Sequence, residues 1–125
     1  MRWLRYLGYA FGGILVTACT AFLIAAWFYR DIPAGVLEAK YGNAASRFLN
    51  VDGVRIHYRD EGSGPPLVMI HANFASLLSW DDAVESLKNT HRVLRFDMTG
   101  HGLTGPDPSG DYSLERTVEL TGRFV

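Results

Sequence analysis

One long stretch of this sequence lacks charged side chains. No Asp, Glu, Lys or Arg lies between Tyr6 and Tyr29, although these residue types make up 20% of the chain. The formal net charge is −1, so there is no basic excess of the kind that favours nucleic acid, and no nucleic-acid partner is expected. Cys19 is the single cysteine, which excludes an internal disulfide, and no spacing of His and Cys residues indicates a metal site.

The uncharged stretch predicts a helix that spans a membrane. Residues 6–29 as a helix extend about 36 Å, which exceeds a hydrocarbon core of about 30 Å. Arg2 and Arg5 before the stretch outweigh Arg30 after it, so the N-terminus is expected to be cytoplasmic. We therefore expect a single-pass protein with a membrane anchor at residues 1–30, the lipid bilayer as one partner, and the following domain on the extracytoplasmic side.

Two other fates of this segment stay open. A cleaved signal peptide would have a shorter apolar region, about 7 to 15 residues, and a small-residue cleavage site. The residues Val16-Thr17-Ala18-Cys19 resemble a lipoprotein processing box, in which Cys19 would become a lipidated N-terminus. The residues after Cys19 remain apolar up to Tyr29, which favours an uncleaved anchor.

The rest of the sequence indicates a linker at residues 31–47 and an α/β domain at residues 48–125. Asp52-Gly53 suits a type I′ turn between two antiparallel strands at 48–51 and 54–58. Apolar residues alternate along the second strand, so we expect His57 to point to solvent. Beyond it, the order strand, helix, strand predicts a parallel pair joined by a crossover helix.

The strand Leu67–Ile70 is the most apolar part of this domain, and we expect it to be buried on both faces. It ends at His71-Ala72-Asn73-Phe74. Because open α/β folds bind ligands beyond the carboxyl ends of their strands, these residues are the expected site. The later run Gly100–Gly105 reads G-x-G-x-x-G, but a Pro-rich loop follows it instead of a helix, so no dinucleotide or other cofactor is expected.

Four motifs in this order resemble the N-terminal part of an α/β-hydrolase. They are Val51-Asp52-Gly53 with the run from His57 to Gly62, the strand ending at His71-Ala72-Asn73-Phe74, Trp80, and the run Asp97-Met98-Thr99-Gly100-His101-Gly102. The resemblance implies an antiparallel hairpin followed by parallel strands with crossover helices. It makes the main-chain N–H of Asn73 an oxyanion-hole donor, with His71 and Phe74 as substrate-binding residues. Ala72 stands where the family has Gly, and a positive φ angle there would strain its backbone.

No G-x-S-x-G nucleophile motif occurs in the 125 residues, and nothing resembles the family's later catalytic acid or histidine. The resemblance therefore implies an incomplete hydrolase domain, expected to be inactive as it stands. We expect the parent to be a membrane-anchored serine hydrolase or esterase that acts on a small ester-like substrate by acyl transfer.

An alternative also follows from Asn73, because haloalkane dehalogenases of this fold have Asn at this point and use an Asp nucleophile on halogenated substrates. An epoxide hydrolase-like enzyme, or a non-catalytic binding member of the fold, remains open as well.

Overall fold

The computed structural model describes residues 2–125, which divide into two compact units. The first unit contains helix α1, Arg2–Phe28, and none of its residues is buried. Within the described residues, α1 is the one helix long and apolar enough to cross a membrane, and such a helix close to the N-terminus also fits a signal sequence. The predicted apolar helix is thus present, whereas its orientation stays a prediction.

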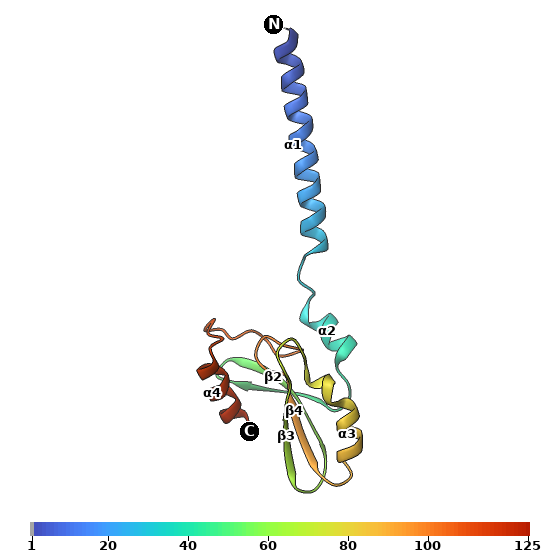
Figure 1. Ribbon diagram of the computed structural model, residues 1–125, viewed down its shortest axis with the longest axis vertical. Coiled ribbons are helices and arrows are strands. Elements are labelled where there is room, and N and C mark those ends of the chain that lie inside the picture. Colours follow the sequence, from blue (N-terminus) through green and yellow to red (C-terminus); the bar gives the residue numbers. More distant parts are fainter. Residues whose placement is uncertain (1) are drawn as a thin grey trace. The chain divides into compact units, whose positions relative to one another are not determined.

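The second unit, Ala34–Val125, is built on a mixed four-stranded sheet (Figure 1). The strand order is β1-β2-β4-β3, with β3 parallel to β4 and the other neighbours antiparallel. The elements, in chain order, are α2 (Ala34–Tyr41), β1 (Ser46–Val51), β2 (Val54–Gly62), β3 (Pro66–Ile70), the 3₁₀ helix η1 (Leu77–Trp80), α3 (Asp81–Leu87), β4 (Arg92–Phe96) and α4 (Leu114–Phe124). The hairpin, the parallel pair and its crossover helix agree with the α/β architecture expected from the sequence.

The turn between β1 and β2 has the backbone that its residues predict. Asp52 and Gly53 have φ angles of 51° and 85°, the two positive values that a type I′ turn needs. Asn50 Oδ1 accepts the Gly53 N–H at 2.9 Å, which stabilises the turn further. Pairing of Val51 with Val54 then fixes the register of the hairpin.

The two faces of the sheet carry separate apolar clusters. On one face Leu120 and Phe124 of α4 pack against Ile56 and Phe96. On the other face Val84 of α3 packs with Met69 and Val93. Helices α3 and α4 thus cover opposite faces of the sheet (Figure 1).

The prediction that β3 is buried on both faces is wrong. Met69 is buried, but Val68 and Ile70 on the opposite face are 43% and 48% exposed. The reason is position: β3 is an edge strand of this sheet, and among residues 2–125 the cluster around α4 forms on β1, β2 and β4 without reaching it.

The prediction that His57 points to solvent is also wrong. The His57 side chain is buried, with 1% of the residue exposed. Alternation along β2 assumes one solvated face, but here polar groups from the start of β1 and from the end of β4 cover that face and bond to His57. Both faces of β2 are therefore covered, one by apolar and one by polar contacts.

Candidate active site

The chain turns sharply after β3, and His71 ties this turn to the loop after β4. His71 Nε2 accepts the Met98 N–H at 3.0 Å, and His71 Nδ1 donates to the Ala72 carbonyl at 2.8 Å. A ring nitrogen that accepts from a backbone N–H carries no proton, so this geometry requires the neutral Nδ1–H form. The His71 side chain is buried, at 4% exposure, and its two bonds hold the turn after β3 and the loop after β4 together.

Asn73 lies at the tip of this turn with donor groups free. Its main-chain N–H has no hydrogen-bond partner among residues 2–125, and its side-chain Oδ1 accepts the Phe74 N–H at 3.1 Å and faces His101 Nε2 at 3.0 Å. This free N–H lies at the carboxyl end of a parallel strand, which is the position predicted from the sequence for the oxyanion donor. Whether it acts on a substrate stays a prediction.

The positive φ angle considered for Ala72 in the sequence occurs instead at Phe74. Among the described residues that are not glycine, only Asp52 and Phe74 have positive φ, and Phe74 has a value of 60°. Ala72 therefore has no positive φ angle, and its Cβ does not cause the backbone strain considered from the sequence. A left-handed bulky residue costs about 1 to 2 kcal/mol, and Phe74, at 96% exposure, gains no packing in return.

The carboxylate of Asp97, the residue directly after β4, binds both the segment after β3 and the loop after β4. Its Oδ1 accepts the Leu77 N–H at 2.7 Å, and its Oδ2 accepts the Leu103 N–H at 2.9 Å and the His57 Nδ1–H at 2.8 Å. Burial raises the pKa of Asp97, but the bonds from His57, Leu103 and Leu77 outweigh it and hold the pKa below its ordinary value. Asp97 is not among the site residues expected from the sequence, although an Asp that follows a strand and opens the run to Gly102 was the available signal.

Gly102 belongs to the same arrangement. It has a φ of 53°, and a Cβ added to it would overlap the Asp97 carboxylate. A glycine at position 102 thus leaves the space that the Asp97 carboxylate needs.

Ser46, His57 and Asp97 form a hydrogen-bonded series with the connectivity of a catalytic triad. His57 donates from Nδ1 to Asp97, and its Nε2 lies 2.9 Å from Ser46 Oγ. However, Ser46 Oγ already accepts the Asn43 N–H at 3.1 Å and lies 3.4 Å from Arg59 Nε. An oxygen occupied by these donors is a poor nucleophile, so the series is best explained as a brace between β1, β2 and β4.

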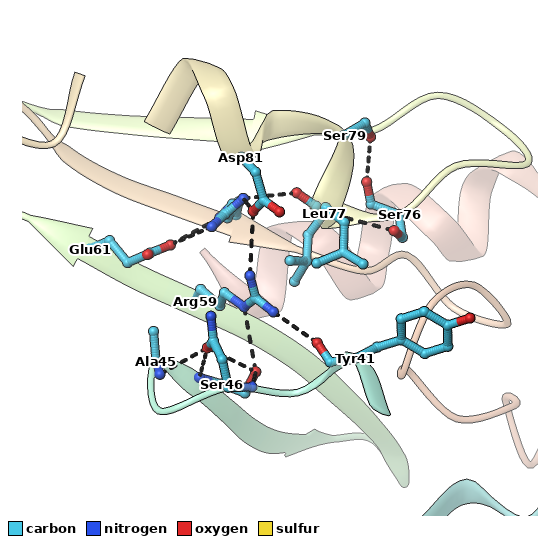
Figure 2. Close-up of polar contacts among 12 residues, drawn as sticks. Tyr41, Ala45, Ser46, Arg59, Glu61, Ser76, Leu77, Ser79 and Asp81 are labelled. Atoms are coloured by element: carbon cyan, nitrogen blue, oxygen red, sulfur yellow. Dashed lines mark hydrogen bonds and ion pairs between the residues drawn. The ribbon is translucent and has the colours of Figure 1, made fainter. Parts of the chain in front are cut away.

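Two buried arginines, Arg59 of β2 and Arg95 of β4, are cross-strand partners in the sheet. Figure 2 shows Arg59 with its bonds to Asp81 and to the Tyr41 carbonyl. Arg95 bonds Glu61 at 2.8 Å and Asp81 at 2.5 Å, and Arg59 reaches Asp81 at 3.4 Å. Burial, with the charge of Arg95, lowers the pKa of Arg59. The Asp81 carboxylate, shared by both arginines, and the Glu61 carboxylate on Arg95 therefore compensate two like charges.

Arg95 also binds the backbone at the start of η1, the element that follows the turn after β3. Arg95 Nη1 donates to the Leu77 carbonyl at 3.1 Å, while Asp97 accepts the Leu77 N–H. Both main-chain groups of Leu77 are thus held by side chains of β4 or its end. This clamp fixes the chain four residues after Asn73.

A cavity of about 160 Å³ opens beside this clamp, lined by Leu37, Tyr41, His57, Ser76, Leu78, Asp97, Gly102 and Leu103. His71, Asn73 and Phe74 do not line it, so the cavity lies apart from the expected oxyanion donor. Within residues 2–125, no cluster of three or more His, Cys, Asp or Glu side chains is arranged to hold a metal ion.

No protein-family model matches the chain. It is 39% identical over 74 residues to a cis-3-alkyl-4-alkyloxetan-2-one decarboxylase of Shewanella oneidensis, over 58% of this chain and 23% of that protein. It is 31% identical over 80 residues to haloalkane dehalogenase 2 of Mycobacterium bovis, over 64% of this chain and 28% of that protein. The fold matches the crystal structure of the Cif epoxide hydrolase from Acinetobacter nosocomialis with a TM-score of 0.63 and 29% identity, over 76% of this chain and 34% of that one.

These similarities favour one of the interpretations left open by the sequence. The chain spans about a quarter of the length of the curated relatives it matches. Relatives named for epoxide hydrolysis and haloalkane dehalogenation support the Asp-nucleophile alternative better than the serine-hydrolase interpretation.

Proposed function

This chain belongs to the α/β-hydrolase fold family, and from this premise we propose that it is the N-terminal part of a membrane-anchored hydrolase with an Asp nucleophile. The proposed substrates are small, uncharged molecules such as haloalkanes or epoxides. In this proposal residues 1–30 are the anchor, residues 31–47 the linker, and residues 48–125 an incomplete catalytic domain.

The observation that carries the proposal is the position of Asn73. It follows an edge strand that is parallel to β4, and its main-chain N–H is free among the described residues. An Asp nucleophile forms a covalent ester with the substrate carbon, and water then attacks that ester. The negative oxygen of the resulting tetrahedral intermediate needs N–H donors, and the Asn73 N–H supplies one, with an effect of about 3 to 4 kcal/mol on the barrier.

His71 and Phe74 have supporting roles in the proposal. His71 holds the turn through Met98, so it fixes the direction in which the Asn73 N–H points. Phe74 presents its ring to solvent at 96% exposure and would contact an apolar substrate from one side. No catalytic nucleophile is assigned within the 125 residues, and we propose that this chain alone is inactive.

Reading the coding sequence past the codon for Val125 tests the proposal directly. We expect a strand-to-helix elbow with Asp at its centre. Serine at that position would replace the proposal by an esterase, and a residue that is not nucleophilic would make the protein a binding member of the fold. If the elbow carries Asp, release of halide or diol by the purified full protein is the confirming measurement.

The anchor has its own test. The apolar helix α1 and the charges around it support a single-pass arrangement with a cytoplasmic N-terminus. Carbonate washing should leave the protein in the membrane fraction. Release into the supernatant, or an N-terminal sequence starting after residue 19, would replace the anchor by a signal peptide.

A further inference from the structure

We propose that His101 fixes the orientation of the Asn73 carboxamide and thereby decides which of its atoms faces a bound substrate. The significance for catalysis rests on the proposed function, but the contacts do not. His101 lies in the loop after β4, where its Nε2 is 3.0 Å from Asn73 Oδ1 and its Nδ1 is 3.0 Å from the Thr99 carbonyl oxygen. Each ring nitrogen therefore faces an oxygen.

The partners of this ring determine its protons. The Thr99 carbonyl can only accept, so Nδ1 carries a hydrogen. The orientation of the Asn73 amide follows from its other contact, because Oδ1 also accepts the Phe74 N–H at 3.1 Å. With that oxygen toward His101, Nε2 must donate as well. All three hydrogen bonds are made together only by the doubly protonated imidazolium.

Loss of one proton from His101 gives a different arrangement. The bare Nε2 would then face the Asn73 oxygen, lone pair against lone pair. Rotation of the carboxamide would let its NH₂ group donate to Nε2, but the Phe74 N–H would lose its acceptor. The carbonyl oxygen of Asn73 would then point away from His101. The charge of His101 thus selects between an outward NH₂ and an outward oxygen.

The outward group sets the chemistry that the turn accepts. With His101 charged, the Asn73 NH₂ and the free main-chain N–H of the same residue are both donors, which suits a halide or a negative oxygen. With His101 neutral, an acceptor stands beside that donor and repels an anion. His101 is therefore a positioning residue that acts through Asn73.

Its surroundings contain few competing charges. The titratable ring packed against it is His71 at the end of β3, with ring centroids 5.4 Å apart, and the contacts of His71 require its neutral form. Among residues 2–125, no salt bridge joins His101 to a carboxylate. Of the two groups that contact the Asn73 side chain, the Phe74 N–H and the His101 ring, only the ring belongs to a residue type that changes charge between about pH 5 and pH 8.

The test is a pH titration of the isotope-labelled full chain in detergent micelles, followed by NMR from about pH 5 to about pH 8. The Asn73 side-chain NH₂ and the Phe74 N–H resonances should shift together with the ring of His101. His101→Phe should abolish these shifts. His101→Gln, whose amide donates without titrating, should keep the low-pH resonance positions at every pH. His91→Phe, on the remote turn before β4, is the matched control and should change nothing.

Two results would overturn the inference. One is an unchanged titration of Asn73 and Phe74 in the His101→Phe chain, and the other is a His101→Gln chain that resembles the high-pH form. If His101→Phe fails to fold, the His101→Gln spectrum decides. Bromide added to the same samples tests the proposed function separately, because coupled shifts without a bromide response would retain the role of His101 and argue against a halide site.

Discussion

His57 Nδ1 donates to Asp97 Oδ2 over 2.8 Å, and both side chains are about 98% buried. This contact joins the centre of β2 to the residue from which two site loops are held. Asp97 accepts the N–H groups of Leu77 and Leu103 as well, so one carboxylate connects β2, the turn after β3 and the loop after β4. Asp97 thus fixes the start of η1, four residues after the proposed oxyanion donor Asn73, to the loop after β4.

The first prediction concerns Asp97→Asn. The amide can accept on one side only, so at least one buried N–H is left unpaired, at about 1 to 3 kcal/mol each. We expect the free energy of unfolding of the full chain in micelles to fall by about 3 kcal/mol. Asp60→Asn is the matched control, because Asp60 pairs with Arg92 at the surface and should change stability by less than about 1 kcal/mol. Equal losses of unfolding free energy in the two variants would show that the bonds of Asp97 to the two loops do not stabilise the domain.

The second prediction separates two glycines of one loop. Gly102→Ala places a Cβ against the Asp97 carboxylate at a positive φ, whereas Gly105→Ala meets no atom within 4 Å and has no positive φ. We expect Gly102→Ala to lower the free energy of unfolding by about 2 kcal/mol or more. Gly105→Ala should be neutral or slightly stabilising. Denaturant unfolding of both variants checks the difference, and similar midpoints would contradict it.

The third prediction is a pH dependence from Asp107. The Arg116 guanidinium, with two bonds from Ser109, lowers the pKa of Asp107 to about 2. A carboxyl whose pKa is lower in the folded protein stabilises it above the ordinary value of about 4, and this contribution is lost as the pH falls from about 4 to about 2. Asp107→Asn should therefore flatten the acid limb of the stability curve. Arg116→Gln, which removes the main cause, should flatten it too; an unaltered acid limb in both would refute the assignment.

The sequence predicted best those features that short segments determine. The type I′ turn depends on the adjacent pair Asp52-Gly53. The prediction that His57 is exposed was wrong because its partners, Ser46 and Asp97, lie 11 and 40 positions away in the sequence. Alternation along one strand contains no information about such distant partners. Asp97 was missed for the same reason. The strain at Phe74 instead of Ala72 depends on the path of the whole turn.

The last prediction concerns the open edge of the sheet. Val68 and Ile70 are about half exposed on β3, whose outer side has no partner strand among residues 2–125. Such an edge pairs with other chains, and a lysine on it opposes that pairing. Val68→Lys should therefore lower the aggregated fraction measured by light scattering, with little change in stability. Val36→Lys removes a similarly exposed apolar side chain from α2 and should not reduce aggregation. Met69→Lys, one residue further along β3, should instead unfold the domain, because it buries an unpaired charge. If Val36→Lys protects as well as Val68→Lys, general hydrophobicity and not strand pairing drives the association.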